Sequence, residues 1–198
     1  MKKFYEYLAI IFTVFLADCF SKVALLRFLC AKYCHVIDIY NPDSVLATNP
    51  INQVQGIIVP WEYIVGGDYG LSNFLRIQFV WNKGVSFSAF NNFLPVLLII
   101  GTSLIIIWLL WYFIKKSASY ERLPLAFIIG GALGNLFDRI RFGAVVDFIQ
   151  FHIGNIWSFP AIFNVGDVFI SLGVCLYFIR LFINRRRCLN NLKLTKDK

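Results

Sequence analysis

The sequence predicts an all-α membrane protein of four transmembrane helices with a small β-structure on one side of the membrane. Three observations predict this class. The chain of 198 residues is 59% hydrophobic. Only 15% of its residues are charged, whereas a soluble domain has about 25%. The apolar residues form four long runs, each near the ~20 residues that cross a bilayer as a helix. At this length we expect one integral membrane domain, residues 1–198.

The first predicted span covers about residues 4–28. Its start resembles a lipoprotein signal peptide, but Asp18 stands where a small neutral residue is needed before Cys19. The apolar run also continues past this point, so we expect an uncleaved span. Asp18 and Lys22 are four residues apart and share a helical face. Asp18 needs a partner at membrane depth, and Lys22 alternatively extends to the membrane surface.

Residues 29–92 form the longest non-spanning region. Its first half is rich in Asn, Gly and Pro, which is typical of an irregular loop. In its second half, Leu75–Trp81 alternates and carries β-branched and aromatic residues, which predicts a short strand followed by turn and strand pieces through Phe90. Cys30 and Cys34 pair if this region is oxidised, and the sequence leaves both the paired and the free state open.

The three remaining predicted spans are about residues 93–114, 123–140 and 163–183. The first of them is almost uniformly apolar and is typical of a plain membrane anchor. The next contains Gly130 and Gly134 at the small-xxx-small spacing, which permits close approach of a neighbouring helix.

Basic residues orient the predicted bundle. They cluster at Lys2, Lys115 and Arg185–Arg187, which all fall on one side of a four-span protein. The positive-inside rule makes this side cytoplasmic and places both termini there, with a basic tail at residues 184–198. The long loop and residues 141–162 then face the other compartment.

Two other partner classes are not expected from the residue pattern. The net charge is +8, yet the basic residues flank apolar runs and do not pattern a soluble face, which argues against a nucleic-acid partner. His35 and His152 are far apart in the sequence, and the five cysteines show no metal-ligand spacing. We therefore expect no metal site.

Asp147 and Asp167 are the leading candidates for chemistry. The predicted topology puts both at the outer edge of the membrane, on the same side. Two carboxylates close together do not both ionise easily, so one keeps a proton and the pair acts as general base and general acid at one pH. Such a pair activates a water for attack on an amide and protonates the leaving amine. The alternative is that each carboxylate is solvated, salt-bridged or caps a helix end.

Polar residues among the apolar runs are the next candidates. Asn135, Asp138 and Arg139 lie on one helical face by their spacing. The simplest interpretation is a structural polar cluster, in which Arg139 alternatively anchors an anionic or carbonyl-rich partner. The segment Asn82–Gly84 is either a hairpin turn or, together with Asn164, a source of amides that orient a carboxylate pair and bind a substrate backbone.

These residues resemble the lipoprotein signal peptidases (signal peptidase II), the membrane aspartic peptidases of bacteria. The resemblance covers the four-span layout and nearly the whole chain. Four blocks carry it in order, which makes it highly specific: Asp18-Cys19-Phe20-Ser21-Lys22; Asn82-Lys83-Gly84-Val85-Ser86-Phe87-Ser88; Gly131 to Arg139, continuing through Gly143-Ala144-Val145-Val146-Asp147-Phe148; and Phe163-Asn164-Val165-Gly166-Asp167.

The resemblance implies that Asp147 and Asp167 are catalytic and that no metal or organic cofactor is needed. We expect a monomer in the bacterial inner membrane, with both termini cytoplasmic as the basic residues indicate. Its partners would be membrane lipids and diacylglyceryl-modified prolipoproteins, cleaved just before the modified cysteine at the periplasmic side. A periplasmic β-cradle would come from Leu75–Phe90. The matching motif positions imply that the substrate site is lined by Asn82, Gly84, Asn135, Arg139 and Asn164. They also imply that Asp18, Lys22 and Asp138 support this site.

The sequence departs from the family pattern at two small residues. Gly166 and Ser86 stand where the family usually has Ala, and the loop of about residues 31–72 is longer than expected. Asn164–Asp167 also shares part of the presenilin-type protease signature, but no partner motif occurs. Two rival functions are a small proton-coupled transporter that uses the same carboxylates, for which no inverted repeat is visible, and a non-enzymatic scaffold whose polar groups only tie helices together.

Overall fold

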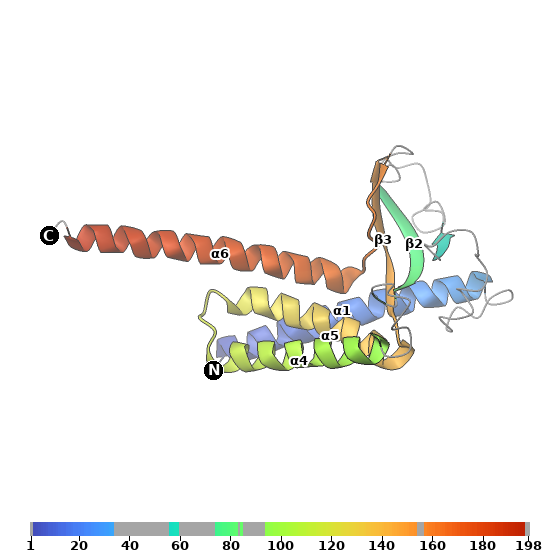
Figure 1. Ribbon diagram of the computed structural model, residues 1–198, viewed down its shortest axis with the longest axis horizontal. Helices are drawn as coiled ribbons and strands as arrows, with labels where there is room; N and C mark the ends of the chain where they lie inside the picture. The colour runs from blue at the N-terminus through green and yellow to red at the C-terminus, as the bar shows by residue number, and fades with distance from the viewer. Residues whose placement is uncertain are drawn as a thin grey trace.

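Four long helices make up the body of the protein (Figure 1). The computed structural model describes residues 2–33, 56–59, 74–82, 84, 94–153 and 157–196. Each helix is long and apolar enough to cross a membrane, which confirms the four predicted spans. They are α1 (Lys2–Tyr33), α4 (Leu94–Lys115), α5 (Arg122–Phe142) and α6 (Val165–Lys196).

Helix α6 is longer than the apolar run that predicts it. It continues to Lys196, through the residues for which the charge pattern predicts a polar tail. Arg, Leu and Lys are good helix formers, and neither Gly nor Pro occurs between residues 184 and 196. Figure 1 shows this last part of α6 extending beyond the other three helices.

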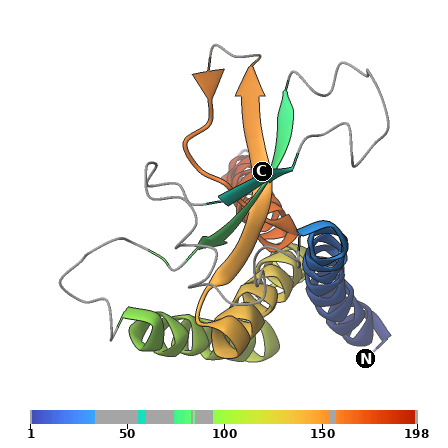
Figure 2. The same cartoon turned by 90° about the vertical axis from the view of Figure 1, so that its right-hand side faces the viewer.

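A small antiparallel sheet stands at one end of the bundle, and the α4–α5 turn and both termini lie at the other end (Figures 1 and 2). Its strand order is β1-β2-β3-β4. The predicted strand is β2, whereas β1, β3 and β4 were not predicted. The pieces predicted after β2, Cys34 and the Cys30 side chain lie outside the described residues. The strands are β1 (Gly56–Val59), β2 (Leu75–Asn82), β3 (Val145–Ile153) and β4 (Trp157–Ser158).

Glycines on α5 let the neighbouring helices approach closely. A Cβ atom at Gly130 would lie 2.7 Å from Cβ of Val14 on α1, and one at Gly134 would overlap the Asp18 carboxylate. The predicted close-approach role of this glycine pair is therefore confirmed. On another side of α5, a Cβ at Gly131 would overlap the backbone of Gly166 on α6. Helix α5 thus holds the middle of α1, around Asp18, and the first turn of α6 against itself.

The sheet rests on the end of α1 through an apolar cluster. Leu25 and Leu26 of α1 pack with Phe79 and Trp81 of β2 and with Val146 of β3. Phe79 and Val146 are fully buried. Burying apolar side chains of this size stabilises the docked sheet by about 1.5–3 kcal/mol each. The cluster fixes β3 over the ends of α1 and α5, and β3 carries Asp147.

Candidate active site

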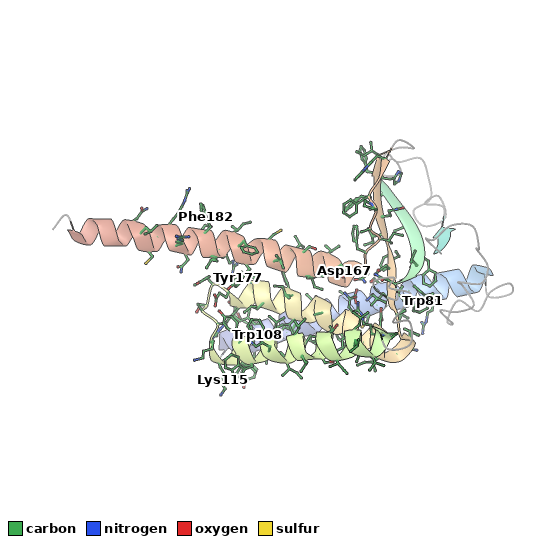
Figure 3. The ribbon with its side chains drawn as sticks, in the orientation of Figure 1. Trp81, Trp108, Lys115, Asp167, Tyr177 and Phe182 are labelled. Carbon is green, nitrogen blue, oxygen red and sulfur yellow. The ribbon has the colours of Figure 1, made fainter. Side chains whose placement is uncertain are left out.

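Asp167 lies in the first turn of α6, where the local sequence forms a reciprocal cap. The Asn164 Oδ1 atom accepts a hydrogen bond from the Asp167 backbone N–H at 2.9 Å, and Asp167 Oδ2 accepts one from the Asn164 N–H at 3.2 Å. This is the geometry of a capping box, with Asn164 as the N-cap residue. The free N–H groups of the helix N-terminus also stabilise a negative charge at this position. Figure 3 shows Asp167 where α6 meets the sheet.

Asp147 is the third residue of β3, and backbone pairing brings it to the start of α6. Ile149 of β3 forms a bridge with Phe163, the residue before the Asn164 cap. On the other side of β3, Val80 pairs with Asp147 and Asn82 pairs with Val145. Asp147 is therefore held between β2 and the α6 N-terminus. Its side chain is buried, with 2% of its surface exposed.

Two asparagine amides join Asp147 and Asp167 in one hydrogen-bonded cluster. Asn164 Nδ2 donates to Asp147 Oδ1 at 2.6 Å and to Asn135 Oδ1 at 3.0 Å. Asn135 Nδ2 in turn donates to Asp167 Oδ1 at 2.8 Å. Asn82 Nδ2 completes the cluster by donating to Asp147 Oδ2 at 2.8 Å. Both oxygens of each carboxylate thus accept a hydrogen bond from the protein.

The environment of Asp147 favours the protonated carboxyl. The pKa of Asp147 is raised from 3.8 to about 7, mainly by burial and also by the negative charge of Asp167, while the Asn82 and Asn164 amides and the charge of Lys22 oppose the shift. A carboxyl that keeps its proton near neutral pH, beside a second carboxylate, has the chemistry of an acid–base pair. Because the two groups interact, this titration belongs to the pair.

Lys22 of α1 binds the residues that position the aspartate cluster. Its Nζ atom lies 2.6 Å from Asp18 Oδ2 and 3.0 Å from Asp138 Oδ2, and donates to Asn135 Oδ1 at 3.1 Å. Asp18 Oδ1 accepts from the Gly166 N–H at 2.7 Å, so the lysine holds both α5 and the first turn of α6. The predicted need of Asp18 for a partner is confirmed. The alternative that Lys22 extends to the membrane surface is wrong, because only 2% of its surface is exposed.

The remaining predicted residues border the same cluster. The Asp138 carboxylate also accepts from the Val146 N–H at 3.2 Å, which ties the end of α5 to the start of β3. The Arg139 guanidinium is half-buried, donates to the Asn135 carbonyl at 3.3 Å and interacts electrostatically with both Asp147 and Asp167.

The Asn82–Gly84 segment combines the two interpretations that the sequence leaves open. The Asn82 side-chain carbonyl accepts from the Gly84 N–H at 2.9 Å and closes a turn, while its amide binds Asp147. Gly84 has φ 92°, a left-handed conformation that favours glycine. The turn therefore fixes the amide that faces the carboxylate. Lys83 and Ser86 lie outside the described residues.

Sequence reasoning missed two features of the site. One is the capping box, whose signal is an Asn-x-x-Asp spacing immediately before an apolar run. The other is β3 itself, which places Asp147 in a strand. Among the residues with described positions, no three His, Cys, Asp or Glu side chains are grouped as metal ligands.

The sequence profile of the signal peptidase (SPase) II family matches residues 10–183. The chain belongs to this family. A relative named lipoprotein signal peptidase, from Anaplasma phagocytophilum (strain HZ), is 39% identical over 144 residues, which cover 71% of this chain and 89% of the relative. Another of that name, from Pelagibacter ubique (strain HTCC1062), is 32% identical and covers 94% of both chains.

Solved structures share the overall fold of this chain. One, described as a bacterial membrane enzyme structure, superposes with a TM-score of 0.57 at 23% sequence identity. The match covers 91% of this chain and 89% of the other. At this identity the likeness concerns the arrangement of the helices and the sheet.

Proposed function

We propose that the protein is a lipoprotein signal peptidase whose acid–base pair is Asp147 and Asp167. It removes the signal peptide of a prolipoprotein by cleaving just before the diacylglyceryl-modified cysteine. The family and the names of the relatives support the activity. The observation that carries the mechanism is the hydrogen-bonded cluster that joins the two aspartates at the sheet end of the bundle.

Asp147 is the proton donor and Asp167 the proton acceptor in the first step. Asp167 lies in the first turn of α6, where its two carboxylate oxygens accept hydrogen bonds from the Asn135 amide and the Asn164 backbone N–H. It takes a proton from water as the water oxygen attacks the scissile carbonyl carbon. The raised pKa of Asp147 keeps a proton on this residue. That proton passes to the leaving amine as the carbon–nitrogen bond breaks, and the proton from water restores the pair.

Five other residues are proposed to line the substrate site, and three to support it. Among the described cations beside the aspartates, Arg139 is the one that is not fully buried, so it is suited to hold a peptide carbonyl. Lys22, Asp18 and Asp138 act from behind, through Asn135 and the first turn of α6. The substrate-site residues are Asn82, Gly84, Asn135, Arg139 and Asn164.

The charge distribution supports one orientation in the bacterial inner membrane. Lys115 and the three arginines Arg185–Arg187 lie toward the end opposite the sheet (Figures 1 and 3). The positive-inside rule makes that end cytoplasmic. The sheet and the aspartates then face the periplasm at the outer leaflet, where a lipid-anchored precursor presents its cleavage site. Every group in the mechanism comes from one chain, so a monomer suffices, and no organic cofactor enters the proposed steps.

The transporter alternative uses the same carboxylates but explains fewer observations. Asp147 and Asp167 gather at one end of the bundle and share asparagine partners. A proton path across a membrane requires further ionisable groups along its length. Family membership also favours the peptidase.

Cleavage of a lipidated precursor tests the function directly. We expect the purified protein in detergent to convert a diacylglyceryl-modified prolipoprotein into two products, which mass spectrometry identifies. The larger product should begin at the modified cysteine. The same precursor without its lipid serves as the comparison and should be cleaved far more slowly. Intact lipidated precursor after prolonged incubation, or cleavage at another bond, would contradict the proposal.

The activity should decline as the pH rises through about 7, because Asp147 then loses the proton that the leaving amine needs. Above this pH Asp147 is ionised, and kcat/KM should fall about tenfold per pH unit. Asn82→Ala removes a hydrogen bond that favours the ionised form of Asp147, so the pKa should rise and the midpoint should move to higher pH.

The control for this pH profile is Asn190→Ala, which changes an exposed asparagine on α6. Its midpoint should equal that of the wild type. Asn82→Ala is also expected to weaken substrate binding, but the midpoint of the pH profile is a separate quantity. An unchanged midpoint, or one at lower pH, would show that the Asn82 amide does not act on Asp147.

A further inference from the structure

A cavity lies behind the aspartate pair, between α1 and α5. It measures about 420 Å³, and its walls come from one face of α1, the end of α5 and Val146 of β3. Neither Asp147 nor Asp167 lines it. The Lys22–Asp138 ion pair stands in its wall and separates it from the proposed substrate site. The proposed peptidase mechanism makes no use of this space.

Two exposed arginines border the cavity, Arg27 on α1 and Arg141 on α5. Within the described part of the chain neither forms an ion pair, and the Arg141 guanidinium lies over the Phe142 ring, 4.9 Å from its centroid. Lys22 has no donor to spare, because its ammonium group already faces three acceptors. The charge available to a ligand is therefore that of the two arginines.

The position of these arginines is unusual for a membrane protein. They lie at the sheet end of the bundle, opposite Lys115 and Arg185–Arg187. Basic residues normally collect at the other end, so two arginines here without an ion pair among the described residues indicate a local anionic partner. Basic pockets between transmembrane helices are suited to phospholipid headgroups.

Apolar side chains line another part of the cavity. Val23 and Cys19 on α1 and Phe137 on α5 line it toward the middle of the membrane. Phe137 and Val23 are also partly exposed on the bundle surface, with 42% and 38% of their area accessible. The volume lies within the ~300–1,000 Å³ of small-molecule sites. It suits a headgroup with its glycerol, while acyl chains would continue along the outer surface of α1 and α5.

We propose that this cavity binds an anionic glycerophospholipid of the surrounding bilayer. Arg27 and Arg141 hold its phosphate, and its glycerol lies against Val23 and Phe137. The lipid would fill the space behind the Lys22–Asp138 pair and hold the ends of α1 and α5 together. The diacylglyceryl group of a prolipoprotein carries no phosphate, so it is a chemically distinct ligand. The proposal stands or falls independently of the peptidase activity.

Native mass spectrometry of the purified full-length protein, titrated with phosphatidylglycerol in neutral detergent, tests the arginine pair. Replacing both residues, Arg27→Gln with Arg141→Gln, should weaken binding about 30-fold. The matched control replaces Arg185 and Arg187 by Gln at the other end of the bundle, with the same change in charge, and should keep the wild-type affinity. Equal affinity of the Arg27/Arg141 variant and the wild type, or equal weakening in the control, would overturn the proposal.

The native thiols supply a second test that needs no substitution. Cys19 lines the cavity, whereas Cys175 and Cys188 are exposed on α6. Bound phosphatidylglycerol should slow the alkylation of Cys19 by N-ethylmaleimide and leave the rates at Cys175 and Cys188 unchanged. Diacylglycerol and inorganic phosphate are the comparison ligands. Equal protection by diacylglycerol would show an acyl-chain site, and equal protection by inorganic phosphate a free-phosphate site, and either result would overturn the proposal.

Discussion

Replacing either aspartate by asparagine should abolish precursor processing. We expect kcat/KM of Asp147→Asn and of Asp167→Asn to fall by about 10³-fold or more, because an amide neither accepts the proton from water nor donates one to the leaving amine. The double variant should be no slower than the slower single variant, since the two groups act as a unit. Product formation from a lipidated precursor, followed by mass spectrometry, measures all three.

Folding of these variants must be measured alongside their activity. Both oxygens of Asp147 accept hydrogen bonds from asparagine amides. In Asp147→Asn, the new side-chain NH2 group would face one of these amide donors and could not accept its hydrogen bond. This mismatch costs about 1–3 kcal/mol of stability. Thermal unfolding should therefore show a lower midpoint but an intact cooperative transition. Glu6→Gln, at an exposed carboxylate on α1, is the control and should retain full activity. Substantial processing by either folded aspartate variant would rule out the pair as the catalytic groups.

The four spans could be predicted because membrane helices follow from composition alone. A run of apolar residues of sufficient length has few alternatives in a bilayer. The glycine contacts of α5 could be predicted for a similar reason, since Gly130 and Gly134 differ by one helical turn and face the same neighbour. The C-terminal extent of α6 could not be predicted, because its charged residues indicate a solvated tail while their helix propensity favours a longer helix.

The proximity of the two aspartates could be hypothesised from the residue pattern, but no local rule requires it. It depends on the bridge between Ile149 and Phe163, a long-range pairing that neighbouring residues do not encode. It also depends on Asn164 acting at once as a helix cap and as a donor to Asp147. The first role has a local signal, and the second appears only when β3 and α6 are placed in space. The catalytic roles themselves remain proposals.

The partners of Lys22 could likewise be predicted only in part from the sequence. The four-residue spacing to Asp18 predicts a shared helical face, and the two side chains do pair. The contacts of Lys22 with Asp138 and Asn135 join α1 to α5, and they exist because Gly134 lets the two helices approach. One ammonium group therefore connects two carboxylates and the amide that binds Asp167.

Lys22→Met should destabilise the protein more than any single change at the surface. Methionine fills similar space but leaves Asp18 and Asp138 as buried carboxylates without a cation, and Asn135 Oδ1 loses a donor. Removing one partner of a buried ion pair costs about 3–5 kcal/mol. Thermal unfolding in detergent measures the loss. Processing should fall as well, because Asp18 binds the Gly166 N–H in the turn that carries Asp167.

Two further variants separate the loss of the charge pair from the loss of packing. Lys115→Met removes an exposed lysine from the end of α4 and should change stability by no more than about 0.5 kcal/mol. Combining Lys22→Met with Asp18→Asn and Asp138→Asn removes the two unpaired charges, so part of the lost stability should return. If the triple variant were less stable than Lys22→Met alone, the cost would come from the shape of the cluster. The uncompensated carboxylates would then not be its source.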